Sequence, residues 1–275
     1  MTVKLAVFGN PIEHSLSPQI HRLFGESAGI DLSYEKQLVP LDGFADAVQA
    51  FFAGGGTGIN ITVPFKKDAF EFVSRWSEVA RLAGAVNTIV KDTDGKLRGE
   101  NTDGSGLVSD LQNNLGWQLK GKSILILGAG GAVQGVLPNL LDAEPQQIVI
   151  ANRTHANALK LSDATADERV IACPLDDLSG PFDVIISASS AGLGGASTKL
   201  DLPVSLLGPN TCVYDMIYGK ETPFLRWSES LPSSQCSDGL GMLVEQAACA
   251  FNLWFGVKVE TRSVLDQLRT DKQKV

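Results

Sequence analysis

The sequence Ile124-Leu-Ile-Leu-Gly-Ala-Gly-Gly-Ala-Val-Gln-Gly joins a predicted strand to a predicted helix through a glycine-rich turn. Gly128 and Gly130 allow a tight turn and a close approach of the backbone to a pyrophosphate. The helix N-terminus adds free N–H groups and the positive end of its dipole. The motif is a variant of G-x-G-x-x-G, because Val133 stands at the third glycine position. Taken alone, such a turn also fits a purely structural role.

A second predicted strand, Ile148–Ala151, ends where many dinucleotide-binding proteins place an acidic residue. Asn152-Arg-Thr follows it. Enzymes that use NAD have Asp or Glu near this point to bind the ribose 2′-hydroxyl. Arg153 could instead pair with a 2′-phosphate through two parallel hydrogen bonds and stack on the adenine. An ordinary surface arginine is the alternative, but the combination with the glycine turn favours NADP(H).

Two hydroxyl groups follow the first predicted strand, in Gly9-Asn-Pro-Ile-Glu-His-Ser-Leu-Ser-Pro. Ser17 precedes Pro18, which is the pattern of a helix N-cap followed by proline in the first turn. Ser15 is not needed for capping. Two hydroxyls beside a helix start could also hold a carboxylate.

The segment Asn60-Ile-Thr-Val-Pro-Phe-Lys-Lys carries cations where a helix begins. A strand over Gly58–Val63 would place Asn60 and Thr62 on one face. Lys66 and Lys67 then open a helix predicted over Phe65–Trp76, where positive charge opposes the helix dipole. A local rule broken in this way points to function. The alternative is that the lysines simply point into water.

Two further polar residues stand near predicted element ends. Asp103, in Gly99-Glu-Asn-Thr-Asp-Gly, precedes a helix predicted over Gly104–Leu115, and an N-cap role would also explain it. Asn87, in Ala83-Gly-Ala-Val-Asn-Thr, follows a run of small residues, a pattern that is also typical of close packing.

Strands alternate with helices along the whole chain, which predicts βαβ units and a mainly parallel sheet. A new strand–glycine–helix unit begins at Lys122, so we expect an α/β protein of two domains with a cleft between them. Residues 1–103 with 240–275 would form a substrate-binding domain, and 104–239 a Rossmann-type domain. The last long helix, predicted over Leu240–Phe255, would return to the first domain.

Composition excludes several functional classes. The 275 residues are 44% hydrophobic and 20% charged, and the net charge is −8. No basic block is present, which argues against nucleic-acid binding. The uncharged run Ser123–Leu141 fits a strand, turn and helix better than a membrane span. The cysteines form no C-x-x-C pair and the N-terminal residues no signal peptide, so we expect a cytoplasmic protein without a metal site.

Together these segments resemble the shikimate dehydrogenase family over almost the whole chain. The motifs already quoted, with Tyr214-Asp-Met-Ile-Tyr and Asp238-Gly-Leu-Gly-Met-Leu, occur in the order of that family. The resemblance implies NADPH-dependent, reversible reduction of the keto group of 3-dehydroshikimate to shikimate, by a monomer or homodimer. It also places the active site between two α/β domains.

The resemblance further implies a role for each matching residue. The catalytic pair falls on Lys66 and Asp103. The positions for the substrate are Ser15, Ser17, Thr62 and Tyr218 around the carboxylate, and Asn60, Asn87 and Gln246 at the ring hydroxyls. Those for the cofactor are Gly128, Ala129, Gly130, Gly131 and Ala132 at the diphosphate, Asn152, Arg153 and Thr154 after the second strand, and Met216, Gly239 and Met242 near the nicotinamide.

The sequence departs from the family near the expected 2′-phosphate. Asn157 and Gln134 stand where many relatives carry basic residues, and Lys160 lies one helical turn beyond Asn157. One alternative is therefore a quinate/shikimate dehydrogenase with relaxed use of NAD and NADP. Another is a non-catalytic NADP(H)-binding sensor, although a sensor would not need both Lys66 and Asp103.

Overall fold

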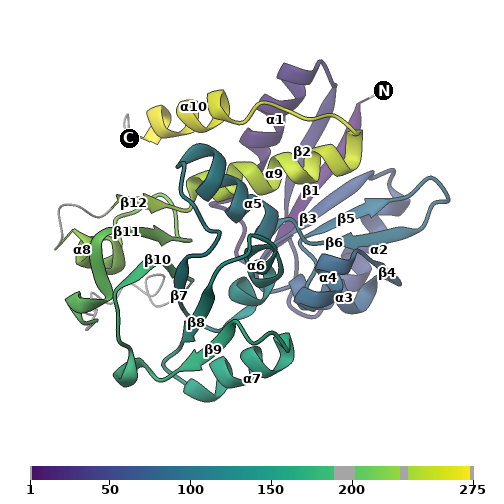
Figure 1. The fold of residues 1–275 in the computed structure, drawn as a ribbon. Coiled ribbons are helices and arrows are strands. Elements are labelled where there is room, and N and C mark those ends of the chain that lie inside the picture. The colour runs from purple at the N-terminus through teal and green to yellow at the C-terminus, as the bar shows by residue number, and fades with distance from the viewer. Residues whose placement is uncertain (1, 189–201, 230–234, 273–275) are drawn as a thin grey trace. The chain divides into compact units, whose positions relative to one another are not determined.

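The structure is a computed structural model, which describes residues 2–188, 202–229 and 235–272 (Figure 1). The chain forms two compact units. Unit 1 comprises Met1–Gly106 and Leu243–Val275, and unit 2 comprises Leu107–Met242. The chain passes from one unit to the other inside two helices, α5 (Asp103–Ser109) and α9 (Leu240–Phe255).

In the described part of unit 1, six strands form one sheet in the order β2-β1-β3-β5-β6-β4. Their bounds are β1 (Val3–Gly9), β2 (Leu32–Leu38), β3 (Gly58–Ile61), β4 (Arg75–Trp76), β5 (Thr88–Lys91) and β6 (Leu97–Glu100). β1 is parallel to both of its neighbours, whereas β5 is antiparallel to β3 and β6. The apolar run Leu5–Phe8 is buried throughout, as expected for a central strand covered on both faces.

The helices of unit 1 come from both ends of the chain. They are α1 (Ser17–Ala28), α2 (Phe44–Ala53), α3 (Lys66–Phe72), α4 (Glu78–Ala83), the start of α5, most of α9, and α10 (Arg262–Lys272). α9 packs closely on the sheet: a Cβ on Gly58 would lie 2.2 Å from Nε1 of Trp254. That indole N–H donates to the carbonyl of Ile89 at 3.1 Å. α10 lies beside α1 (Figure 1).

The described residues of unit 2 form a parallel six-stranded sheet in the order β12-β11-β10-β7-β8-β9. The strands are β7 (Ser123–Leu127), β8 (Gln147–Ala151), β9 (Val170–Cys173), β10 (Phe182–Ser187), β11 (Leu207–Asp215) and β12 (Gln235–Asp238). The helices are α6 (Gly131–Asp142), α7 (His155–Thr165), α8 (Pro223–Ser228) and a π-helix, Asp110–Asn114, that continues α5. This strand order is that of a dinucleotide-binding fold. The first three strands are added toward one edge of the sheet (β7, β8, β9) and the next three toward the other (β10, β11, β12), so the order reverses between β7 and β10. The predicted fold class is confirmed.

Several expectations about local structure are wrong. The helix predicted over Phe65–Trp76 ends at Phe72, where Val73 turns to an extended backbone, and Arg75–Trp76 pairs with β6. The predicted strand Gly58–Val63 ends at Ile61. The prediction of a mainly parallel sheet does not hold for β5 and β6 of unit 1, which form an antiparallel hairpin around the turn residues Asp94-Gly95.

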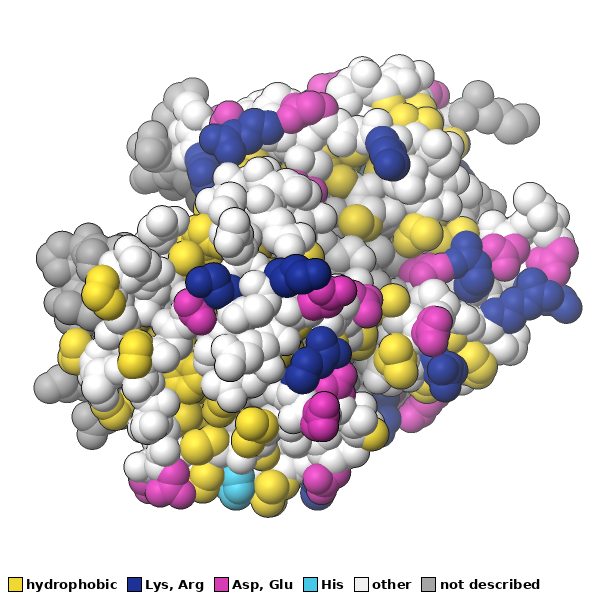
Figure 2. All heavy atoms as spheres, viewed as in Figure 1, with side chains coloured by type: hydrophobic (Ala, Val, Ile, Leu, Met, Phe, Trp, Pro, Cys, Tyr) yellow, Lys and Arg dark blue, Asp and Glu magenta, His cyan; other side chains and the backbone are white. Residues whose placement is uncertain are grey.

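Acidic and basic side chains are interspersed on the face shown in Figure 2, where dark blue and magenta groups lie next to one another. Among the described residues, Lys122 pairs with Asp183 at 2.9 Å and Arg169 with Asp167 at 2.7 Å. Within the described residues, no helix has the length and apolar character that crossing a membrane requires.

Candidate active site

Lys66 and Asp103 come together in unit 1. Lys66 is the first residue of α3 and Asp103 the first of α5, and Nζ of the lysine lies 2.5 Å from Oδ2 of the aspartate. The Lys66 side chain is 26% exposed. The neighbouring Lys67 is 81% exposed, and its Nζ lies 4.0 Å from Oε1 of Glu71. The expectation that a lysine here points into water therefore fits Lys67 and not Lys66.

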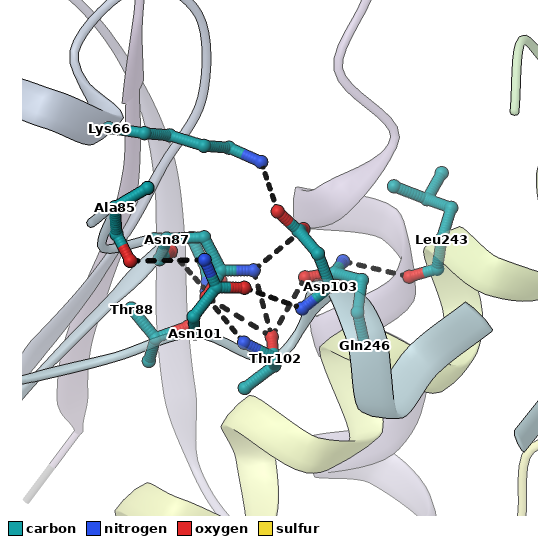
Figure 3. A network of polar contacts seen from close by, with 10 residues as sticks. Lys66, Ala85, Asn87, Thr88, Asn101, Thr102, Asp103, Leu243 and Gln246 are labelled. Carbon is teal, nitrogen blue, oxygen red and sulfur yellow. Dashed lines mark hydrogen bonds and ion pairs between the residues drawn. The ribbon is translucent and has the colours of Figure 1, made fainter. Parts of the chain in front are cut away.

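The Asp103 carboxylate is fixed from its second oxygen as well. Nδ2 of Asn87 donates to Oδ1 of Asp103 at 2.8 Å. The backbone N–H of Asp103 donates to Oδ1 of Asn101 at 3.1 Å, and Asn101 in turn donates to the carbonyl of Ala85 at 3.0 Å. Asp103 thus uses its carboxylate for Lys66 and Asn87 (Figure 3), which gives it a role beyond starting a helix.

Asn87 is the centre of a buried polar network (Figure 3). Its Oδ1 accepts from the backbone N–H of Thr102 at 2.9 Å and from the hydroxyl of Thr88 at 2.9 Å. Its Nδ2 also donates to Oγ1 of Thr102 at 3.0 Å, and that hydroxyl lies 3.4 Å from Oε1 of Gln246 on α9. Nδ2 of Asn60 donates to Oγ1 of Thr88 at 2.9 Å, so Asn60 joins the same network.

Gln246 reaches this network because α5 and α9 pack closely. A Cβ on Gly106 would lie 2.7 Å from the backbone nitrogen of Gln246, so a side chain there would force the helices apart. The Gln246 amide also donates to the carbonyl of Leu243 at 2.8 Å. The position of Gln246 therefore depends on a glycine that belongs to none of the predicted site motifs.

Ser15 and Ser17 form a pair at the start of α1. Oγ of Ser15 lies 3.2 Å from Oγ of Ser17. The predicted N-cap role of Ser17 is wrong: α1 begins at Ser17, and Leu16 is the N-cap. The backbone N–H of Ser17 donates to Oγ of Ser15 at 3.3 Å, so Ser15, which was not expected to take part in capping, is the residue that accepts from the helix start.

Thr62 lies near the carboxyl end of β1. Its backbone N–H donates to the carbonyl of Phe8, and a Cβ on Gly9 would lie 2.5 Å from Cγ2 of Thr62. β3 ends at Ile61, which pairs with Phe8. The carboxyl ends of two parallel strands thus bring Thr62 close to the segment that leads to Ser15.

The glycine turn of unit 2 fits a dinucleotide phosphate. Gly128 has φ +123°, a conformation that side chains rarely adopt, and its N–H donates to the carbonyl of Ala151. A Cβ on Gly130 or Gly131 would meet no described atom within 4 Å, so the exposed turn leaves room for a ligand. No described side chain caps α6, which leaves its first N–H groups for an anion.

Val133 explains the variant glycine motif. It stands at the third glycine position, and its side chain is fully buried in the core of unit 2 with Ile126 and Val136. The helix and strand therefore pack through a side chain here. The two glycines that would approach a ligand remain.

The segment Asn152–Thr154 lies next to that turn. Leu127 and Ala151 are register partners, so the residues that follow β7 and β8 leave the sheet side by side. Nδ2 of Asn152 donates to the carbonyl of Thr154 at 2.9 Å and shapes the loop. Arg153 is exposed, as are the Asn157 and Lys160 side chains of α7.

The residues expected near the nicotinamide cluster at the ends of β11 and β12. A Cβ on Gly239 would lie 2.3 Å from the carbonyl oxygen of Met216, so only glycine allows this approach. Met242 is largely buried and belongs to the core cluster against which Met216 packs. Tyr218 follows in the same loop, and burial raises the pKa of its hydroxyl.

Sequence reasoning missed four residues of the unit 1 network. Asn101, Thr102 and Thr88 stand within the motifs that carried the resemblance, but no chemistry distinguished them. Tyr34 lies outside every motif, and its hydroxyl donates to Oδ1 of Asn60 at 2.6 Å. A tyrosine in a polar edge strand, Leu32-Ser-Tyr-Glu-Lys-Gln-Leu, carries no signal that sequence alone would reveal.

Three family models match the chain. They describe the shikimate dehydrogenase substrate binding domain at residues 7–89, shikimate/quinate 5-dehydrogenase at 110–193, and the shikimate 5′-dehydrogenase C-terminal domain at 239–269. A shikimate dehydrogenase (NADP(+)) from Alkalilimnicola ehrlichii is 52% identical over 273 residues, which are 98% of this chain and 100% of that protein.

The chain is also similar to solved structures over nearly its whole length. The chain is 43% identical to an Ael1 enzyme from Pseudomonas putida, with a TM-score of 0.91 over 97% of this chain and 98% of that one. It is 32% identical to shikimate 5-dehydrogenase from Thermus thermophilus in complex with NADP(H) and shikimate, with a TM-score of 0.87 over 98% and 99% of the chains. On this similarity, which extends over nearly its whole length, the chain belongs to the shikimate dehydrogenase family.

Proposed function

We infer that the protein catalyses the reversible, NADP(H)-dependent reduction of 3-dehydroshikimate to shikimate. One structural observation carries the proposal furthest: Lys66 and Asp103, which belong to different helices, lie 2.5 Å apart in a partly open position. The family of the chain and the fit of the glycine turn to a dinucleotide support the same conclusion.

We assign proton transfer to Lys66. Bound NADPH supplies a hydride to the carbonyl carbon, and the carbonyl oxygen then needs a proton and nearby positive charge. Within the described residues the Lys66 ammonium donates to Asp103, which leaves two of its three N–H groups for a substrate oxygen. Asp103 orients the ammonium and balances its charge.

Two groups of residues would hold the substrate. Ser15 and Ser17, with Thr62 near them, would donate hydroxyl hydrogen bonds to the carboxylate, and Tyr218 of unit 2 is predicted for the same group. Gln246 keeps one amide N–H for a ring hydroxyl after its bond to Leu243. Both amide hydrogens of Asn60 are used within the protein, so Asn60 would contact a hydroxyl through its oxygen, which also accepts from Tyr34. Both hydrogens of Asn87 are used as well, and its oxygen accepts from Thr102 and Thr88, so Asn87 would have to exchange one of these partners to bind a ring hydroxyl.

Unit 2 would hold the cofactor. The diphosphate would lie against residues 128–132 and the N-terminus of α6, with Arg153 beside the 2′-phosphate. Met216, Gly239 and Met242 would lie near the nicotinamide. The exposed Asn157 and Gln134 add no positive charge, so we expect weaker discrimination against NAD+ than in relatives with more basic groups. The assignment of residues 1–103 with 240–275 to the substrate and 104–239 to the cofactor is part of this proposal.

Steady-state oxidation of shikimate with NADP+, followed by NADPH absorbance, tests the proposal. Lys66→Ala should reduce kcat by roughly 10²–10⁴-fold, the usual contribution of acid–base help. Lys67→Ala is the matched control, because the adjacent, exposed lysine should be dispensable. Near wild-type turnover in Lys66→Ala would refute the assignment. An inactive wild type that still binds NADP+ would favour the sensor.

The quinate/shikimate alternative is tested in the same assay with quinate and with NAD+. A comparable kcat/KM for quinate would favour it over the narrower function. Occurrence as a monomer or homodimer, and a cytoplasmic location, stay predictions that sedimentation and cell fractionation would check.

A further inference from the structure

A directed chain of hydrogen bonds leads away from the Lys66–Asp103 pair. Asp103 accepts from Asn87, Asn87 accepts from Thr88, and Thr88 accepts from Asn60, at 2.8, 2.9 and 2.9 Å. Asn60 in turn accepts from the Tyr34 hydroxyl at 2.6 Å. The chain thus connects β2, at the edge of the sheet, with the first turn of α5. Its part from Thr88 to Lys66 is drawn in Figure 3.

Backbone groups fix the orientation of both amides in this chain. The Asn87 carbonyl can only accept, and Nδ2 of Asn60 donates to it at 3.3 Å. The Thr102 N–H can only donate, and it donates to Oδ1 of Asn87 at 2.9 Å. The Thr88 hydroxyl therefore accepts from Asn60 and gives its single hydrogen to Asn87. Oδ1 of Asn60 can then be contacted only by donors, and the Tyr34 hydroxyl supplies one at 2.6 Å.

The ring of Tyr34 is held by packing. It stacks on the buried His21, with ring centroids 4.4 Å apart and planes 8° from parallel, and Trp254 lies 6.5 Å away. Removal of the hydroxyl from water raises the pKa of Tyr34 well above its usual value, and a hydrogen bond donated by the Ser17 hydroxyl to the Tyr34 oxygen opposes the shift. The hydroxyl thus keeps its hydrogen throughout the pH range of an enzyme assay.

We propose that Tyr34 and Thr88 are positioning residues, which act through Asn60 and Asn87 to hold Asp103 in place against Lys66. Without the Tyr34 hydroxyl, the buried Oδ1 of Asn60 would lose a donor at 2.6 Å, and the Asn60 side chain would shift toward another. Its bond to Thr88 would then weaken, Thr88 would hold the oxygen of Asn87 less firmly, and Nδ2 of Asn87 would be less precisely placed against Asp103. The inference rests on the proposed role of Asp103.

The first test separates kcat from KM. Tyr34→Phe and Thr88→Val should each lower kcat for shikimate oxidation about three- to tenfold, the usual net worth of one hydrogen bond. KM for shikimate should change less, and Thr88→Ser should restore kcat because it keeps the hydroxyl. Thr211→Val is the control, since it removes a buried hydroxyl that donates to Phe182 in unit 2. A raised KM with unchanged kcat would overturn the proposal, because it would indicate a role in substrate binding only.

The second test asks whether Tyr34 acts through Asp103. In the Asp103→Asn background, Tyr34→Phe should change kcat less than about 1.5-fold, because residues of one network are not additive. The same fold loss in both backgrounds would overturn the proposal. Circular dichroism shows whether Tyr34→Phe and Thr88→Val fold. If one of them does not, the same comparison of single and double variants, made with the other and Asp103→Asn, decides the question. The wild-type assay comes first, so failure of the proposed function is seen separately.

Discussion

His21 gives the protein a pH dependence that its buried position dictates. The ring is fully buried on α1 and lies against Tyr34 and Trp254, at 4.4 and 5.3 Å between centroids. Burial lowers the pKa of His21 to about 3. An unfolded chain has a histidine pKa of about 6.5. Between these two values the unfolded state binds a proton that the folded state does not, so the free energy of unfolding decreases as the pH falls below 6.5.

The size of the effect follows from linkage. At pH 5, protonation stabilises the unfolded state by RT ln(1 + 10^1.5), about 2 kcal/mol, relative to pH 8. At pH 6 the same expression gives about 0.8 kcal/mol. Both values of pH lie above the usual range of carboxyl groups, so carboxylates contribute little to the difference between variants.

Urea unfolding of the wild type, His21→Phe and His14→Gln at pH 8, 6 and 5 tests this reasoning. His14 is exposed and serves as the matched control. The wild type and His14→Gln should lose about 2 kcal/mol between pH 8 and pH 5, and His21→Phe much less. Parallel pH profiles for the wild type and His21→Phe would refute the reasoning, whatever their absolute stabilities.

Three further predictions concern binding and packing. Ser15→Ala with Ser17→Ala should raise KM for shikimate by more than about tenfold, at about 1.5–3 kcal/mol for each bond to a charged group. An unchanged KM in the folded double variant contradicts the role. Arg153→Ala should raise KM for NADP+ about tenfold and leave KM for NAD+ unchanged. Asn157→Arg should lower KM for NADP+ and leave KM for NAD+ roughly unchanged. An unaltered ratio of kcat/KM for the two cofactors would place Arg153 outside the pocket. Gly106→Ala should cost about 1–3 kcal/mol in denaturant unfolding, because the helices must separate. If Gly106→Ala were as stable as the wild type, the two helices would not need to separate.

Helices and strands could be predicted from the sequence where their own residues carry a strong local signal. The bounds of α9 agree with the prediction, and β8 begins one residue before the strand predicted over Ile148–Ala151, since a long apolar helix and a short apolar run are local signals. β6 was missed because Leu97-Arg-Gly-Glu has no strand pattern. Its two charged side chains, Arg98 and Glu100, pair with each other, and Arg98 also pairs with Asp92 of the preceding turn at 3.2 Å. The π-helix was missed because it depends on a distant contact, from the Tyr214 hydroxyl to Asp110 at 2.7 Å.

The residues of the candidate site also differ in whether a local signal could reveal them. Lys66 could be singled out because a cation at a helix start breaks a local rule. Tyr34 could not, because its role depends on meeting Asn60, which is 26 residues away in the chain. The Ser17–Pro18 pattern misled because the helix begins one residue earlier than the capping pattern implies.

The return of α9 to unit 1 has a consequence for synthesis on the ribosome. Unit 2 is a continuous segment, whereas unit 1 needs Trp254 against Gly58 and Phe251 against Phe24 to complete its core. At about 5–20 residues per second, the nascent N-terminal part waits roughly 7–27 s while unit 2 is translated. During that time the surface that α9 will cover is open, so the first segment to leave the ribosome is the last to finish folding and the one that chaperones have most time to bind.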